Sequence, residues 1–184
     1  MLQFHLYNTA LRQYPKVKYE WLNNSGSLYT TTIHVLVSAV QKIARSTKLQ
    51  EGLKLYRGLG TTLDFPDSFF KSDRLGCRGF VEWGFVSTTA DKDVAFQYSG
   101  LEDGRQLPMV LEITVGSVAR GACIREVSQY PHEEEHLWVP CSFLESAGNR
   151  VLEVTPEGVV ALIPVRINVN LKARTAEEIR GQKR

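Results

Sequence analysis

The sequence is short of the features that mark several classes of protein. It holds three cysteines in 184 residues, Cys77, Cys123 and Cys141, and no C-x-x-C pair. This number and spacing argue against a disulfide framework and a zinc knuckle, and favour free thiols in a reducing compartment. The 22 Lys and Arg residues nearly balance the 20 Asp and Glu residues, and the net charge is +2. The basic residues are scattered except in the tail at 172–184, so we expect no nucleic-acid partner.

Long hydrophobic runs are also missing. The most apolar stretch, at 33–40, is far shorter than the roughly 20 residues that a membrane-spanning helix needs. The N-terminus lacks the charged segment and the apolar run of a signal peptide. We therefore expect a soluble, cytoplasmic protein without membrane contact. Apolar residues at 43% and charged residues at 23% are typical of a globular protein.

The chain length predicts one domain over residues 1–184, and its pattern changes once along the way. A helical part is expected at about 1–50, a β-rich core at about 51–171, and the basic tail at 172–184. The order of helices first and strands later predicts an α+β fold, with N-terminal helices packed on a mixed or antiparallel β core.

The helices are predicted from the spacing of apolar residues. One helix is expected at 2–11, ending before Pro15, and a second at 28–44, after a polar cluster at 23–27 that can cap it. A short third helix is expected after Thr88, which forms a capping pair with Asp91. Period-two alternation predicts strands at 53–57, 80–87 with an interruption at Gly84, 109–115, 137–139, 143–144, 151–154 and 159–169.

Two short motifs have alternative interpretations. Gly58-Leu59-Gly60 after a strand suggests a dinucleotide fold, but Leu63 stands where the third glycine would be and no βαβ unit follows. The sequence His132-Glu-Glu-Glu-His136 matches the H-E-x-x-H zinc signature, which requires a helix. The apolar strand that follows and its closing Pro140 argue against that helix. A solvated acidic loop is the simplest reading of these residues.

The acidic triplet nevertheless enters a strand that is apolar enough to be buried. Glu133 and Glu135 are two residues apart, so an extended chain would place both on one face and Glu134 on the other. Two acids on one face suit acid–base chemistry or the stabilisation of a developing cation. Glu134 is expected to point away from the site.

Three motifs, in this order along the chain, resemble the Arg-Ser-Glu (cholera-toxin-like) mono-ADP-ribosyltransferases. They are Tyr56-Arg57-Gly58 on an early strand, Phe85 to Thr89 at a strand-to-helix junction, and the acidic triplet 133–135. Residues 135–140 also resemble the family's Glu-x-Leu-x-x-Pro strand. The resemblance spans about 28–169 and implies a single ADP-ribosyltransferase catalytic domain, with NAD+ held between two small sheets and no metal.

The resemblance implies a role for each motif residue. Arg57 would bind the phosphates of NAD+, since a planar guanidinium can donate two hydrogen bonds to them. The backbone at Gly58 would approach the nicotinamide amide, and Ser87 would hold the nicotinamide ribose or the catalytic acid. Glu135 would stabilise the oxocarbenium ion that forms as nicotinamide leaves. The remaining expected cofactor contacts are Thr88 and Tyr98. Either Tyr98 or Phe96 could stack on nicotinamide, and packing in the core is the alternative role for each of these two aromatic side chains.

The position of Glu133 implies which type of residue accepts the ADP-ribose. An acid two residues before the catalytic one resembles the arginine-specific members, in which it would handle an acceptor guanidinium. The expected activity is mono-ADP-ribosylation of an exposed arginine on a protein acceptor. Two alternatives remain open at this stage: an NAD+ glycohydrolase of the same fold, and an inactive module that binds NAD+ or ADP-ribose.

Overall fold

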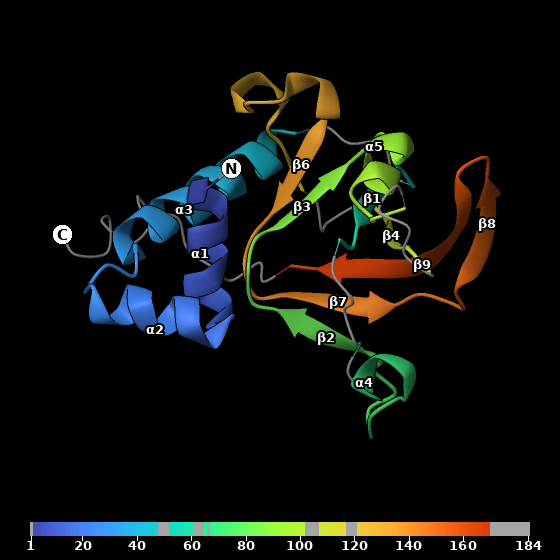
Figure 1. Ribbon diagram of the computed structural model, residues 1–184, viewed down its shortest axis with the longest axis horizontal. Coiled ribbons are helices and arrows are strands. Elements are labelled where there is room, and N and C mark those ends of the chain that lie inside the picture. Colours follow the sequence, from blue (N-terminus) through green and yellow to red (C-terminus); the bar gives the residue numbers. More distant parts are fainter. Residues whose placement is uncertain are drawn as a thin grey trace.

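The computed structural model describes residues 2–47, 52–60, 65, 67–101, 107–116 and 121–169, with side chains from Phe4 onward. The basic tail predicted at 172–184 lies outside the described residues. Figure 1 shows the N-terminal helices lying together on one side of the strands. The helix-first, strand-later order and the α+β class predicted from the sequence are confirmed. None of the helices in the described ranges is both long and apolar enough to span a membrane.

The N-terminal helices are α1 (Leu2–Arg12), α2 (Lys16–Asn24) and α3 (Thr30–Ser46). The sequence predicted two helices here, and α2 was missed because Pro15 reads as a breaker. Pro15 instead occupies the N-cap of α2, where the missing N–H costs nothing. The proposed cap for α3 from the polar cluster 23–27 is wrong: its N-cap is Tyr29, at a φ of 53° and without a side-chain cap.

Most strands lie close to their predicted positions, but the stretch predicted at 80–87 forms two separate strands, and a two-residue strand at 122–123 was not predicted. Four short helical segments lie between them: α4 (Asp67–Phe70), α5 (Lys92–Gln97) and the 3-10 turns η1 (Arg125–Val127) and η2 (Pro131–Glu133). The strands are β1 (Lys54–Gly58), β2 (Gly79–Glu82), β3 (Val86–Thr89), β4 (Met109–Thr114), β5 (Ala122–Cys123), β6 (Glu135–Trp138), β7 (Ser142–Ser146), β8 (Val151–Thr155) and β9 (Gly158–Asn168).

These strands form a mixed sheet in the order β2-β7-β9-β4-β1-β3-β6-β5, with β8 beside β9. The pairing of β4 with β9 is parallel and the other pairings are antiparallel. The link between β1 and β3 is a single register pair, Tyr56 with Thr89, whereas β1 pairs with β4 over five residues. The two expected sheets are therefore two parts of one path, joined at β1 and β3, and the motif residues lie on both sides of this joint.

The larger apolar cluster contains buried residues from both parts of the sheet, including Val86 of β3 and Trp138 of β6. Leu55, Ile113 and Val165, which come from the neighbouring strands β1, β4 and β9, are fully buried in the larger cluster. A second cluster joins Val40 of α3 to Phe85 and to residues of the β6 region. Removing these apolar side chains from water fixes α3 against the part of the sheet that carries β3 and β6.

The start of α5 differs from the prediction. Its N-cap is Asp91, whose side chain accepts hydrogen bonds from Asp93 N at 2.9 Å and Val94 N at 3.4 Å. Thr88 lies inside β3 and does not cap the helix. A carboxylate is the better cap here because it also interacts favourably with the positive end of the helix.

Candidate active site

The centre of the site is a hydrogen bond between Ser87 and Glu135. Ser87 on β3 is paired with Leu137 and Thr89 with Glu135, so the two functional side chains are diagonal neighbours on one face. Ser87 Oγ donates to Glu135 Oε1 at 2.5 Å, and Ser128 Oγ donates to Oε2 at 3.4 Å. Each oxygen of the carboxylate thus accepts a hydroxyl hydrogen bond. The family resemblance implied that the loop 128–132 meets the acceptor, but it did not predict this contact between Ser128 and Glu135.

Arg57 joins this pair from the other part of the sheet. Its Nη1 donates to the backbone carbonyl of Ser87 at 2.8 Å. Burial is the main cause that lowers the pKa of Arg57 to about 10, and Arg12 lowers it further, while Glu82 and Glu135 act in the opposite direction. The guanidinium therefore stays charged at neutral pH. The structure thus brings Arg57, Ser87 and Glu135 together.

A second arginine lies beside Arg57 and was not predicted. Arg12, in the last turn of α1, donates from Nε to Glu82 Oε1 at 2.8 Å, and the same oxygen accepts from Gly84 N at 2.8 Å. Both side chains of the ion pair are mostly buried. No sequence signal could have found this pair, because its members are 70 residues apart in the chain. Its effect is to place a second positive charge near the guanidinium of Arg57.

The acidic triplet does not run as an extended strand, so the predicted geometry is wrong in detail. Glu133 ends η2, Glu134 has a φ of 46° in the left-handed region, and Glu135 is the first residue of β6. Burial raises the pKa of Tyr98, and Glu133 and Glu135 raise it further, which indicates that both acids lie near this side chain. Glu134 instead forms an ion pair with Arg125 at 3.2 Å. The chain reversal at Glu134 thus separates it from its neighbours.

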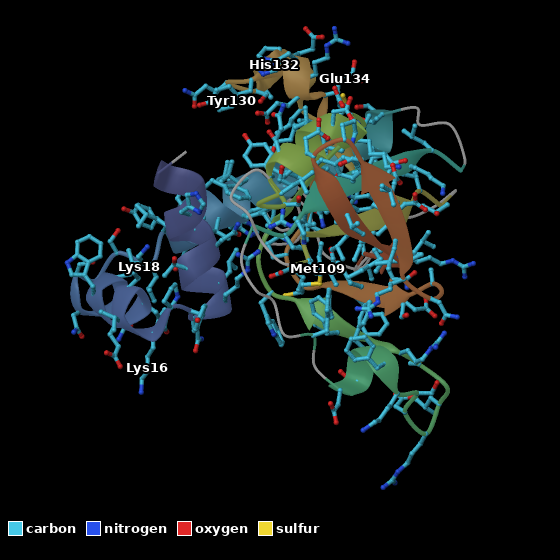
Figure 2. All side chains as sticks on the ribbon, turned by 45° about the vertical axis from the view of Figure 1, so that its right-hand side comes forward. Lys16, Lys18, Met109, Tyr130, His132 and Glu134 are labelled. Atoms are coloured by element: carbon cyan, nitrogen blue, oxygen red, sulfur yellow. The ribbon has the colours of Figure 1, made fainter. Side chains whose placement is uncertain are left out.

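The loop before the triplet lies at the edge of the molecule. Figure 2 shows Tyr130, His132 and Glu134 together on the segment that precedes β6 in the chain. This segment is far from Lys16 and Lys18 on α2. The Tyr98 hydroxyl, on the residue that caps the C-terminus of α5, donates to Glu133 Oε1 at 2.9 Å. This places Tyr98 beside the acids.

Two other predicted residues have positions that change their interpretation. Phe96 packs against the core cluster around Ala95, which supports core packing over nicotinamide stacking for this residue. Thr88 is buried, donates to His136 O at 2.8 Å and accepts from Trp138 Nε1 at 3.0 Å. These bonds use the Thr88 hydroxyl within the sheet, on the opposite face of β3 from Ser87.

Gly58 has a packing role that the sequence did not reveal. A Cβ at this position would lie against the carbonyl oxygen of Ala95, 2.6 Å from the carbonyl carbon of Tyr98 and 2.7 Å from Ser99 N. Such contacts do not occur in folded proteins, so only glycine lets the end of α5 approach β1. This close approach carries Tyr98 toward the site.

The H-E-x-x-H pattern does not form the helix that its zinc interpretation requires. His132 is exposed in η2, whereas His136 is buried in β6. The two imidazoles therefore do not share one helix face, and the described residues contain no group of three or more His, Cys, Asp or Glu placed to bind a metal ion.

The burial of His136 predicts a pH dependence of stability. Burial lowers its pKa, partly opposed by Glu134, and its Nδ1 has no hydrogen-bond partner among the residues that the structure describes. In the unfolded chain this histidine takes up a proton near pH 6.5, whereas in the folded chain it does so only at lower pH. The free energy of unfolding should therefore fall as the pH drops below about 6.5, with a slope of up to about 1.4 kcal/mol per pH unit. Urea unfolding between pH 7.5 and 5 measures this. His136→Leu should flatten the dependence and His132→Gln should not; equal slopes in the wild type and His136→Leu would remove His136 as the cause.

Comparisons with known proteins agree with this fold. The ADP-ribosyltransferase Vis, solved in complex with the M6 inhibitor, is 19% identical, with a TM-score of 0.57 over 94% of this chain and 71% of that chain. The catalytic domain of VahC from Aeromonas hydrophila is 18% identical, with a TM-score of 0.53 over 89% and 91% of the two chains. At these identities the likeness establishes the fold alone. No curated protein sequence matches significantly.

The fold is therefore that of an ADP-ribosyltransferase. Residues 7–139, more than half of the chain, match the model of the ADP-ribosyltransferase exoenzyme family, and the chain belongs to that family. It is an NAD+-dependent ADP-ribosyltransferase, which confirms the family resemblance seen in the sequence.

Proposed function

We propose that this protein transfers ADP-ribose from NAD+ to an exposed arginine of a protein acceptor and releases nicotinamide. The observation that carries the proposal is the pair of acids around Glu134: Glu135 is bonded to Ser87, and Glu133 lies near it, bonded to Tyr98. A transferase needs one acid for the sugar and a second for the acceptor. An inactive binding module needs neither.

The proposed NAD+ contacts begin with the phosphates. Arg57 and Arg12 bring two guanidinium groups close together, and we assign the pyrophosphate to them because it carries two negative charges. We assign the backbone of Gly58, which also lies near α5, to the nicotinamide amide. Ser87 then orients Glu135, so that the carboxylate faces the nicotinamide ribose.

The proposed reaction requires no group beyond these side chains and the two substrates. The bond between ribose C1′ and nicotinamide N1 breaks, and its electron pair leaves with nicotinamide as a neutral base. The positive charge on the ribose is stabilised by the carboxylate of Glu135. A guanidinium nitrogen of the acceptor then bonds to C1′, and Glu133 accepts the proton that this nitrogen loses. Attack by water at the same carbon would give the NAD+ glycohydrolase alternative.

Nicotinamide release distinguishes the candidate functions. Purified protein is incubated with NAD+, with and without agmatine as a small arginine-like acceptor. We expect faster release of nicotinamide with agmatine, together with the formation of ADP-ribosylagmatine. Equal release in both reactions without that product would favour the glycohydrolase, and no NAD+ turnover in either reaction would favour the binding module.

Replacing Arg57 with Lys should weaken NAD+ binding. Lysine keeps the charge but loses the planar pair of donors and the bond to Ser87 O, so the KM for NAD+ should rise about ten- to a hundredfold, as expected for the loss of one charged hydrogen bond. Steady-state nicotinamide release measures this. Arg150→Lys, at an exposed position before β8, is the matched control and should leave the KM unchanged. A normal KM in Arg57→Lys would exclude Arg57 from the NAD+ site.

A further inference from the structure

The hydroxyl of Tyr98 has a role that packing does not explain. The side chain is 49% exposed, so the core does not need it, yet its hydroxyl reaches from the end of α5 to Glu133 Oε1 at 2.9 Å. Burial and the nearby Glu133 raise the Tyr98 pKa. The phenol therefore stays protonated at neutral pH and acts as the donor to this carboxylate.

Glu133 belongs to a loop, and three hydrogen bonds restrain it. Its N–H donates to Tyr130 O at 3.1 Å, its carbonyl oxygen accepts from Thr89 Oγ1 at 2.5 Å, and its carboxylate accepts from Tyr98. Thr89 and Tyr98 both follow Ser87 in the segment formed by β3 and α5. The segment that supplies Ser87 to Glu135 thus also fixes Glu133.

The bond from Tyr98 uses one of the two carboxylate oxygens of Glu133. Oε2 accepts no hydrogen bond from any residue that the structure describes. A guanidinium donates hydrogen bonds in one plane and needs a carboxylate oxygen with a fixed direction. A side chain held through Oε1 presents Oε2 in one direction, whereas a free glutamate would sample several rotamers.

We propose that the Tyr98 hydroxyl is a positioning group for Glu133, which orients this acid toward the acceptor guanidinium and sets the ratio of transfer to hydrolysis. The inference rests on the proposed arginine transfer and adds a residue that governs its acceptor step. Water needs no such orientation, so the hydrolytic reaction depends less on this bond.

The experiment compares transfer to agmatine with NAD+ hydrolysis in four proteins: the wild type, Tyr98→Phe, Glu133→Gln and the double variant. Tyr98→Phe keeps the ring and removes only the hydroxyl. We expect its ratio of transfer to hydrolysis to fall about tenfold, mainly through kcat/KM for agmatine. In the Glu133→Gln background the same change should have no further effect on the ratio, because the two residues act through one contact. Tyr14→Phe removes the hydroxyl of a tyrosine that is 70% exposed and is the control, with an unchanged ratio.

A direct readout of the contact accompanies the kinetics. The pKa of Tyr98, followed by NMR of tyrosine labelled at the ring carbon that bears the hydroxyl, should fall when Glu133 is changed to Gln. An unchanged ratio in Tyr98→Phe, or an equal loss of ratio in both backgrounds, would overturn the inference while leaving wild-type transfer intact. Absence of agmatine transfer by the wild type would instead overturn the proposed function, and the inference with it.

Discussion

Glu135→Gln is expected to abolish both NAD+ hydrolysis and transfer, with kcat lowered by about two to three orders of magnitude. Glutamine keeps the size of the side chain and can still accept from Ser87, but it has no negative charge to stabilise the cationic ribose. Because that ribose forms whatever the acceptor is, the two activities should fall together. Nicotinamide release with and without agmatine measures both.

Glu134→Gln is the matched control for this prediction. Glu134 bears the same group one residue away but pairs with Arg125, at side chains that are each about half exposed, so its loss should be nearly silent. An inactive Glu134→Gln together with an active Glu135→Gln would show that the catalytic acid is assigned to the wrong residue.

Glu133→Gln should separate the two activities. Transfer to agmatine should fall by about a hundredfold, the lower end of the range for one general base, because the neutral amide cannot accept the proton of the guanidinium. Hydrolysis should keep most of its rate, since Glu135 remains bonded to Ser87 and Ser128. Both rates are measured in one reaction from the ratio of ADP-ribosylagmatine to free ADP-ribose.

Glu126→Gln provides the control for Glu133→Gln. Glu126 is an exposed acid of η1, in the same loop, and no hydrogen bond to its carboxylate is found among the described residues. This variant should retain both activities. Equal losses of transfer and hydrolysis in Glu133→Gln would contradict an acceptor-specific role for Glu133.

The sequence predicted the strands and the motif positions well because these signals are local. Period-two alternation located β4 and β9 within two residues at each end. The three motifs each lie within a few residues along the chain, so their placement on β1, β3 and β6 followed directly. What brings them together is antiparallel pairing, which the pattern of strands implies without fixing the register.

In the acidic triplet, the structure separates Glu134 from its neighbours by a different geometry from the one predicted. Alternation along an extended chain separated Glu134 from Glu133 and Glu135. The structure separates them by a left-handed turn at Glu134 that starts β6 at Glu135. A non-glycine residue in this region is uncommon and no local pattern signals it. The pairing of Glu134 with Arg125 was therefore not predictable.

Long-range partners account for most of the site that the sequence did not reveal. Arg12 lies beside Arg57 only because α1 packs against the start of β3, where Asn8 Oδ1 accepts from Phe85 N at 2.8 Å. Gly58 likewise suggested a close approach to a ligand but not to α5, whose C-terminal end occupies the space beside its Cα. Contacts of this kind depend on how whole elements pack, and spacing within one segment does not encode them.

The most direct test of the central claim is the chemical identity of the residue that becomes modified. Acceptor proteins from a cell lysate are incubated with the enzyme and NAD+, and the modified peptides are sequenced by tandem mass spectrometry with fragmentation that preserves the ADP-ribose linkage. We expect single ADP-ribose groups on arginine side chains, present with the wild type and missing with Glu135→Gln. ADP-ribose on asparagine, cysteine or another side chain, with arginine unmodified, would contradict it.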